Sequence, residues 1–367
     1  MLWFLAACLI PSFVVSCSVT GFMRWFSPRI GLIDQPAARK VHTTPTPLGG
    51  GLGIVAGFLL TTIAAHVAVW WLLRQPQLPE WFPAELRPHL TGVLSRGGDF
   101  WKLVVAGLIV ATMGFLDDYR PLPWQPRLLM QLGVAVGLAS CGFRATVFAS
   151  QPWIGFLLTV LWIGVLINAF NFLDNMDALS SGIGLIASTV FAVVMLTSTA
   201  EPKWFVGGVL LVLVGSIAGF LCHNWPPAKI FMGDAGSMFI GLMLASLTLL
   251  GTFYDPQQST RSVILAPLCV LAVPLYDFTS VMLIRLSQGR SPFQADKSHF
   301  SHRLVELGLS RKHAVYTVHL CTLTTGIGAL LLYRVQDWTG AMLVLAMVGC
   351  VLAVIAILET VGRRERL

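Results

Sequence analysis

The sequence predicts an all-α protein that crosses a membrane many times. Only 11% of its 367 residues are charged, whereas roughly 25% of residues are charged in a soluble domain. Hydrophobic residues make up 56% of the chain. They form repeated runs of about 20 residues, the length that crosses ~30 Å of hydrocarbon. This apolar excess is too large for one soluble core, so we expect a polytopic integral membrane protein.

About eleven apolar runs, separated by polar breaks, are candidate transmembrane helices. They lie at residues 2–23, 48–73, 101–116, 128–149, 153–171, 182–199, 204–222, 236–253, 262–285, 314–333 and 338–358. No basic segment precedes the first run and no small-residue cleavage site follows it, so we interpret it as a retained helix rather than a signal peptide. We expect residues 1–367 to form a single transmembrane catalytic domain.

Basic residues predict the orientation of these helices. The loops that follow the odd-numbered helices share one side of the membrane, at 24–47, 117–127, 172–181, 223–235 and 286–313, with a tail at 359–367. This side carries 16 of the 24 Lys and Arg residues when helix ends are counted with the nearer loop. The positive-inside rule therefore places these loops in the cytoplasm and the N-terminus outside. The net charge of +7 reflects this bias and an attraction to the lipid bilayer, and no nucleic-acid partner is expected.

Most residues capable of chemistry lie in these predicted cytoplasmic loops. Five stretches stand out, at residues 34–51, 114–123, 168–182, 223–241 and 294–308. Because all five fall on one side in a topology derived from charge alone, we expect a single active site at the cytoplasmic face. The seven cysteines, in contrast, are scattered singly and predict neither a zinc site nor a disulfide framework.

Two of these stretches are rich in carboxylates at helix ends. Asp117 and Asp118 close an apolar run, where acids oppose the helix dipole, so a metal, a cationic partner or a role as a base is favoured. Asn171, Asp174 and Asp177 recur at a spacing of three and share one face if the segment is helical, and Asn168 extends that face into the membrane. Oxygen ligands of this kind suit Mg²⁺, or alternatively Mn²⁺.

The stretch "FMGDAGS" places Asp234 between two glycines immediately before an apolar run. The helix that follows offers free N–H groups and the positive end of its dipole, which together favour an anion. Asp234 beside this position is a candidate ligand for a metal that bridges to a phosphate.

Basic and histidine residues occupy two further stretches. His299 and His302, with Lys297 and Arg303 around them, are candidates for phosphate binding or proton transfer. Arg39, Lys40 and His42 precede the glycine-rich "TPLGGG", although juxtamembrane basic residues are also common for topological reasons.

One carboxylate, Asp277, lies inside a predicted helix, which makes it a functional candidate by default. Its partner is either Arg285 or a neighbouring helix.

One membrane face is predicted to carry carboxylates that can bind a metal through oxygen, a helix N-terminus and basic residues. This combination indicates phosphoryl transfer to or from a lipid. A cation-coupled membrane transporter is the alternative class, but it would place its acids near the midplane of the bilayer, commonly within an inverted repeat. The CDP-alcohol phosphotransferases are a third class, and their aspartate-rich signature is absent from this sequence.

Taken together, and in this order, the five stretches resemble the polyprenyl-phosphate N-acetylhexosamine-1-phosphate transferase family over residues 30–315. The resemblance implies that undecaprenyl phosphate attacks the β-phosphate of a UDP-N-acetylhexosamine and releases UMP, with Mg²⁺ required. It also implies a bacterial inner membrane, and a homodimer is possible.

The resemblance assigns roles residue by residue. Asp234 matches the metal ligand on the diphosphate. Asp117 matches the acid that deprotonates or orients the lipid phosphate, with Asp118 beside it, and the roles of base and metal ligand stay open within this pair. The residues that match the nucleotide and catalytic site are Asn171, Asp174 and Asp177, and those that match the basic and diphosphate-binding positions are Lys40, His299 and His302.

The branch of the family is indicated by the histidine stretch. "DQPAARKVH" and "SPFQADKSHFSHRLVELGLS" are more similar to the N-acetylglucosamine branch than to the muramoyl-pentapeptide branch. UDP-N-acetylglucosamine is therefore favoured, with another UDP-N-acetylhexosamine or UDP-N-acetylmuramoyl-pentapeptide as alternatives. Ser301 departs from the His-x-His-His pattern typical of the sugar branch, so the role of that position is open.

Overall fold

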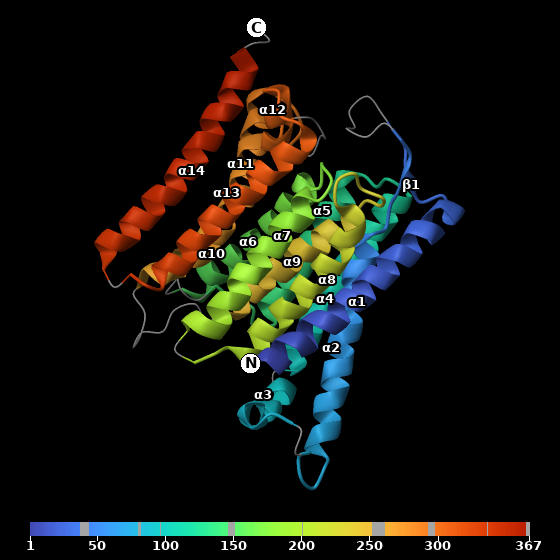
Figure 1. Cartoon of the computed structure of the whole chain (residues 1–367). Helices are drawn as coiled ribbons and strands as arrows, with labels where there is room; N and C mark the ends of the chain where they lie inside the picture. The colour runs from blue at the N-terminus through green and yellow to red at the C-terminus, as the bar shows by residue number, and fades with distance from the viewer. Residues whose placement is uncertain are drawn as a thin grey trace.

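A computed structural model describes residues 1–36, 44–79, 82–95, 97–145, 151–199, 201–251, 261–292, 298–335 and 337–364. Within these ranges the chain is a bundle of helices with one short two-stranded sheet (Figure 1). The first half contains α1 (Leu2–Phe26), η1 (Ser27–Ile30), β1 (Ile33–Asp34), β2 (Thr46–Pro47), α2 (Gly51–Leu73), η2 (Ala84–His89), α3 (Leu90–Ser95), α4 (Gly97–Tyr119), α5 (Trp124–Ser140) and α6 (Pro152–Leu173). The second half contains α7 (Leu179–Val193), η3 (Val194–Ser198), α8 (Trp204–Asn224), α9 (Asp234–Leu250), η4 (Arg261–Leu265), α10 (Ala266–Val270), α11 (Ala272–Ser287), α12 (Phe300–Glu306), α13 (Arg311–Leu332) and α14 (Trp338–Arg364).

The all-α polytopic class predicted from the sequence is confirmed, but the count of eleven spans is not. Among the described residues, eight helices are long and apolar enough to cross a membrane, or nine if a bent pair counts as one span. The α9 helix is apolar but falls in the shorter class.

The ninth expected helix is broken into two pieces that meet at 65°. Its pieces, Ser262–Val270 and Ala272–Ser287, are separated by Leu271. Pro274 explains the break, because its ring nitrogen cannot donate to the carbonyl of Val270 four residues earlier and its ring crowds that carbonyl.

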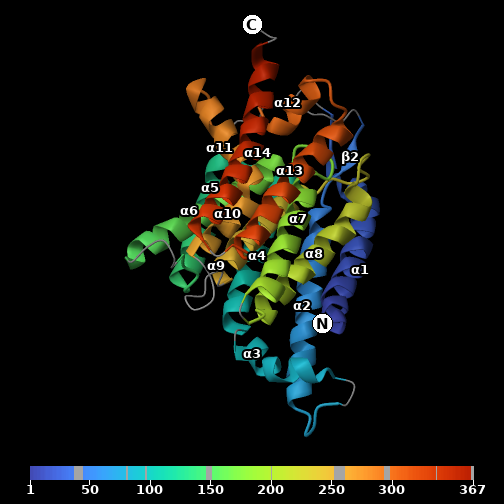
Figure 2. The same ribbon diagram turned by 60° about the vertical axis from the view of Figure 1, so that its left-hand side comes forward.

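The most deeply buried spans are α7 and α8, with 78% and 72% of their apolar windows buried, against 11% for α1 and 22% for α14. Figures 1 and 2 show α7 and α8 toward the middle of the bundle; α14 lies along one side in Figure 1, and α1 lies along one side in Figure 2. Small residues allow the helices to approach closely. A Cβ atom added at Gly57 of α2 would lie 2.7 Å from the Ser12 carbonyl oxygen of α1, and one at Gly219 of α8 would lie 2.4 Å from that of Phe13. Such contacts are typical of helix packing in membranes.

The polar connections gather at one end of the bundle. In Figure 1 the β1–β2 sheet, α12 and the C-terminal end of α14 lie at the upper end, whereas the N-terminus and α3 lie at the lower end. The sheet pairs Ile33 with Pro47 and Asp34 with Thr46 in antiparallel register. The N–H of Phe231 donates to the carbonyl of Pro47 in β2 at 2.9 Å, which brings the chain just before Asp234 to this end.

Candidate active site

Stretches far apart in sequence are joined at the polar end by hydrogen bonds. The N–H groups of Gly50 and Gly51, where α2 begins, donate to the carbonyls of Phe231 and Met232 before α9, both at 2.9 Å. A Cβ atom at Gly51 would lie 2.3 Å from the backbone nitrogen of Gly236. The glycines of "TPLGGG" and "GDAGS" therefore let the starts of α2 and α9 touch.

Asp234 lies at the centre of these contacts. Gly233 before it has a left-handed φ of 75°, which turns the chain into the first residue of α9. Asn171 Nδ2 donates to Asp234 Oδ1 at 2.8 Å and also to the Ser237 hydroxyl at 3.2 Å. Arg127 Nη1 donates to Asp234 Oδ2 at 2.9 Å. Three helices, α5, α6 and α9, thus meet at the Asp234 carboxylate.

Arg127 joins this carboxylate to a second one. Its Nη1 donates to Asp117 Oδ2 as well, while the N–H of Leu122 donates to Asp117 Oδ1 at 2.6 Å. The side chains of Arg127, Asp117 and Asp234 are 22%, 10% and 24% exposed, so solvent reaches all three. Two carboxylates share the partly exposed guanidinium of Arg127. Arg127 can therefore bind a phosphate in place of a carboxylate, and the carboxylates can bind a metal in place of Arg127.

Asp118 has a different environment from Asp117, although the two are adjacent. Its Oδ1 accepts from the backbone N–H of Asp234 at 2.9 Å and its Oδ2 from that of Ala235 at 3.4 Å. A carboxylate that accepts free N–H groups at a helix N-terminus is a capping interaction and is favoured by the helix dipole. Asp118 therefore fixes α9 to α4, whereas Asp117 faces Arg127.

The expectation that Asn171, Asp174 and Asp177 share one helical face is wrong. The α6 helix ends at Leu173, and Asp174 is its C-cap, with φ −80° and ψ 49°. Asp177 lies in the following turn, where its Oδ2 accepts from the N–H of Ala228 at 2.9 Å and anchors the loop before α9. The helix ends where Asp174 takes a ψ of 49°, outside the helical region, and Ala178, with a left-handed φ of 60°, precedes the start of α7.

Asp174 lies close to the start of α9. The backbone of Gly233 hydrogen-bonds its carboxyl. Burial, which penalises the charged form, raises the pKa of Asp174 well above the usual range, and the neighbouring Asp234 carboxylate raises it further. A cation in this region would favour the charged form of both acids.

Asn168 and Arg303 have partners within the protein. Asn168 is buried, and its Nδ2 donates to Gln131 Oε1 on α5 at 2.7 Å and to the carbonyl of Gly164 at 2.8 Å. Arg303 Nη1 donates to Glu306 Oε2 at 2.7 Å within α12. These bonds connect structural elements, and the substrate-binding roles expected for both residues stay predictions.

The histidine stretch forms the short helix α12, and both histidines are buried. His299 is the N-cap residue and its Nδ1 lies 2.8 Å from Asp277 Oδ2 on α11, while the ring centroid of His302 lies 6.3 Å from that of His299. Ser301 donates its hydroxyl to Asn175 Oδ1 at 2.8 Å, which joins α12 to the α6–α7 turn. The serine that replaces the expected histidine is thus hydrogen-bonded to the turn that carries Asp174 and Asp177.

Four of the expected binding residues, Arg39, Lys40, His42 and Lys297, lie outside the described residues.

Arg127 is the main residue that the sequence did not identify. It was counted among the loop cations and given no role, because a lone arginine near a helix start resembles a topological signal. Its position nine residues after Asp118, on the helix following the acidic pair, was the available clue. Asn175 was missed for a similar reason, since it lies between two more conspicuous aspartates.

The described donor set is compatible with a hard cation. No group of three or more His, Cys, Asp and Glu side chains in the described ranges is arranged to hold a metal ion. Mg²⁺, however, is usually bound by one or two carboxylates, with waters and substrate phosphates completing its shell. Asp117 and Asp234 converge on one positively charged group, Arg127 Nη1, as two such carboxylates would. Their chemistry therefore fits Mg²⁺ better than a softer metal.

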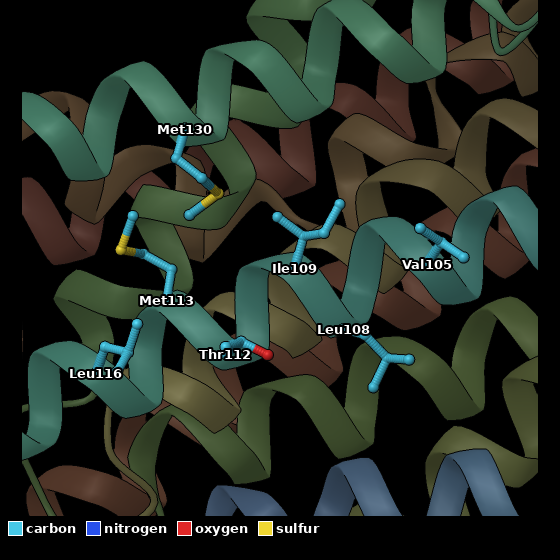
Figure 3. A pocket seen from close by; sticks show the side chains of 7 residues that line it. All are labelled: Val105, Leu108, Ile109, Thr112, Met113, Leu116 and Met130. Carbon is cyan, nitrogen blue, oxygen red and sulfur yellow. The ribbon is translucent and has the colours of Figure 1, made fainter.

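An apolar groove lies along α4 (Figure 3). It has a volume of about 390 Å³ and is lined by Val105, Leu108, Ile109, Thr112, Met113 and Leu116 of α4 and by Met130 of α5. Leu116 directly precedes Asp117, and Met130 lies one helical turn after Arg127. The lining of the groove thus extends along α4 from the residue before Asp117 toward the start of the helix.

Comparison with known proteins places the chain in a family. The profile of glycosyl transferase family 4 matches residues 100–252, which include Asp117, Asp118, Arg127, Asp174 and Asp234. The probable undecaprenyl-phosphate N-acetylglucosaminyl 1-phosphate transferase of Bacillus subtilis is 30% identical over 353 residues, 93% of this chain and 89% of the relative.

Two further relatives cover almost as much. The decaprenyl-phosphate N-acetylglucosaminephosphotransferase of Mycolicibacterium smegmatis is 32% identical, over 86% of this chain and 79% of its own. The undecaprenyl-phosphate alpha-N-acetylglucosaminyl 1-phosphate transferase of Escherichia coli K12 is 26% identical, over 90% and 85%. With a 30% identical relative matched over nearly its whole length, the chain belongs to glycosyl transferase family 4.

Proposed function

We propose that this protein transfers N-acetylglucosamine 1-phosphate from UDP-N-acetylglucosamine to undecaprenyl phosphate. A phosphate oxygen of the lipid attacks the β-phosphorus of the nucleotide sugar, the bond to the α-phosphate breaks, and UMP leaves. The product is undecaprenyl-diphospho-N-acetylglucosamine, the first membrane intermediate of a cell-envelope glycan. The relatives that cover most of the chain carry names of this activity with undecaprenyl or decaprenyl phosphate.

The observation that carries the proposal is the Asp117–Arg127–Asp234 cluster at the end of an apolar groove. A polyprenyl phosphate has one anionic end and a long hydrocarbon chain. Arg127 would bind the phosphate, while the chain follows the groove along α4 past Leu116 and Met113. Asp117, beside Arg127, would orient the phosphate and accept its remaining proton.

The nucleotide sugar would lie on the other side of Asp234. Asp234 and Asp117 would hold Mg²⁺, which when bound neutralises charge on the diphosphate. Asn171 holds the Asp234 carboxylate in position. Asp177 anchors the loop before α9, and Ser301 joins α12 to the Asp174–Asp177 turn, so this turn and the histidine stretch would border the nucleotide. The site would face the cytoplasm, where the nucleotide sugar is found, with the N-terminus outside. The homodimer stays a prediction.

Purified protein in detergent tests the reaction directly. Undecaprenyl phosphate and UDP-N-acetylglucosamine are supplied with MgCl₂, and UMP and the lipid product are measured by mass spectrometry. We expect turnover that EDTA abolishes and that Asp234→Ala reduces by on the order of 100-fold or more. Turnover by Asp234→Ala at the wild-type rate would contradict the assignment. UDP-N-acetylgalactosamine and UDP-N-acetylmuramoyl-pentapeptide serve as competing donors, and decaprenyl phosphate as a competing acceptor.

The groove is tested separately through the acceptor. Ile109→Trp places a large ring in the groove and should raise KM for the lipid while leaving KM for the nucleotide sugar unchanged. Leu129→Trp is the matched control, because Leu129 is 73% exposed on α5 and does not line the groove. Equal effects of the two substitutions would exclude the groove as the path of the chain.

A further inference from the structure

A buried carboxylate–imidazole pair lies beside the site and has no part in the cluster around Asp234. Asp277, on α11, is 1% exposed and His299, at the start of α12, is 4% exposed. Asp277 Oδ2 lies 2.8 Å from His299 Nδ1, and Asp277 Oδ1 accepts from the N–H of Phe300 at 2.9 Å. Both oxygens of one membrane-helix carboxylate are thus used to hold the first two residues of the histidine stretch.

This pair adjoins the residues that surround the proposed nucleotide site. Phe172, one residue after Asn171, lies edge to face with the His299 ring at a centroid distance of 6.1 Å. One residue beyond Phe300, the Ser301 hydroxyl binds Asn175, between Asp174 and Asp177. His299 is therefore fixed by Asp277 on one side and stands against the end of α6 on another.

Other charged groups lie near the pair. Arg285, buried on α11, holds its guanidinium 4.9 Å from the Phe172 ring, on the ring that His299 also contacts. On α12, His302 stands 6.3 Å from His299 between ring centroids, and Arg303 is paired with Glu306.

From α14, which packs on α11 and α12, Glu359 accepts from the Tyr276 hydroxyl at 2.9 Å. Among these groups, Asp277 is the one in hydrogen-bond contact with a ring nitrogen of His299.

A carboxylate at Nδ1 has two chemical effects on an imidazole. It requires the proton to be on Nδ1 in the neutral ring, which leaves Nε2 as the acceptor, and it stabilises the charged ring when Nε2 is also protonated. Without the carboxylate, the neutral ring is free to carry its proton on Nε2. The presence of Asp277 therefore decides what Nε2 offers to a neighbouring phosphate.

We propose that Asp277 is a positioning residue for the transferase reaction. It fixes the tautomer of His299 and supports its positive charge, so that Nε2 can donate a proton or a charged hydrogen bond to the diphosphate of the nucleotide sugar. This role rests on the proposed function, since it needs an anionic substrate at Nε2. Asp277 lies on α11, a helix that contributes no residue to the cluster of Asp117, Arg127 and Asp234.

The isosteric variant Asp277→Asn tests this role in the purified full-length protein. We expect kcat to fall by about 10- to 100-fold, the range seen when a carboxylate that orients a functional histidine is removed. We also expect the alkaline limb of the kcat profile, where His299 loses the proton that it donates, to move to lower pH, because the charged ring loses its counter-charge. Asp277→Glu keeps the charge and should return the limb to its wild-type position. Thr279→Val, on the exposed face of α11, is the control and should change neither quantity.

A double-mutant cycle separates action through His299 from a general loss of packing. In a His299→Gln background, Asp277→Asn should have little further effect on kcat and none on the pH profile. If the two substitutions multiply independently, the proposal fails. If Asp277→Asn does not give a monodisperse protein, the ¹⁵N spectrum of the wild type decides: a neutral His299 ring with its proton on Nδ1 supports the proposal, and one with its proton on Nε2 overturns it.

A readout without turnover keeps this inference distinct from the proposed function. In ¹⁵N-histidine-labelled protein, the ring nitrogens of His299, assigned by their loss in His299→Gln, should show a proton on Nδ1 in the wild type and a different tautomer in Asp277→Asn. Absence of UMP release by the wild type would remove the proposed function while leaving this result readable. An unchanged tautomer in Asp277→Asn would overturn the inference even if the wild type is active.

Discussion

At the scale of the residue, the two adjacent acids at the end of α4 differ in what they contact. Asp117 shares Arg127 with Asp234, in a position that solvent reaches, whereas Asp118 accepts two backbone N–H groups of α9. The sequence showed the pair but not this division, because neighbouring residues on a helix end point in different directions. Arg127 is the residue on which the proposed chemistry most depends.

Arg127→Ala should raise KM for the lipid phosphate by about 10- to 100-fold, the effect of losing a hydrogen bond to a charged group. It also leaves Asp117 and Asp234 facing each other without their cation, so the apparent melting temperature in EDTA should fall and MgCl₂ should raise it more than in the wild type. Arg120→Ala is the control, because Arg120 at the exposed end of α4 contacts neither acid. An unchanged response to MgCl₂ would argue against a cation between these carboxylates.

Asp174→Asn tests the raised pKa of that carboxyl. Between the usual value of about 4 and the raised one, the folded protein binds more protons than the unfolded chain, so stability falls as pH rises through this window. The Asn variant has no carboxyl to titrate, so it should not lose stability in this way as pH rises. In metal-free protein it should have a higher apparent melting temperature at pH 7 than the wild type and a flatter dependence between pH 5 and pH 8, together with reduced turnover. A parallel pH dependence of the two proteins would contradict the assignment.

At the scale of the element, the active site depends on how closely α4 approaches α9. A Cβ atom at Gly114 would lie 2.4 Å from the backbone nitrogen of Ala235 and 2.5 Å from the backbone carbon of Asp234. Backbone atoms cannot rotate away as a side chain can, so only glycine permits this distance. The contact lies one turn before Asp117 and Asp118, and it therefore sets their distance from Asp234.

Gly114→Ala should push α4 and α9 apart, lower the apparent melting temperature and reduce turnover by on the order of 10-fold or more, since small misplacements of catalytic groups are costly. Gly133→Ala is the matched control, because a Cβ atom there would meet nothing within 4 Å. It should preserve turnover and add about 1 kcal/mol or less of helix stability. Comparable losses in the two variants would show that glycine matters here for flexibility rather than for close approach.

At the scale of the whole molecule, composition and the periodic apolar runs predicted the fold well. Each expected segment has a helical counterpart, because twenty apolar residues have few alternatives in a membrane. Helix ends and breaks were harder to predict from the sequence. The end of α6 at Leu173 depends on the non-helical backbone of Asp174, and the break at Leu271 on one proline in a long apolar run. The grouping of the polar stretches followed from topology, but the Asp277–His299 contact joins two elements whose approach no local pattern encodes.

The orientation proposed from charge is testable in cells. The N-terminus and the C-terminal end of α14 lie at opposite ends of the bundle (Figure 1), so tags at the two termini should lie on opposite sides of the membrane. In intact cells or spheroplasts, an added protease should remove an N-terminal tag and spare a C-terminal one. The reverse pattern would place the Asp234 cluster outside, away from cytoplasmic nucleotide sugars, and would remove the proposed function.

The position of Asp118 has a consequence for genetic screens. Because its carboxylate holds the first N–H groups of α9, an Asp118 substitution should shift the start of that helix and score as inactive in complementation, as an Asp234 substitution should. The same phenotype would then have two origins, one architectural and one chemical. Loss of growth at Asp118 should therefore not be taken as proof of an acid–base role. Ligand affinity measured on the isolated variant protein is what would tell the two origins apart.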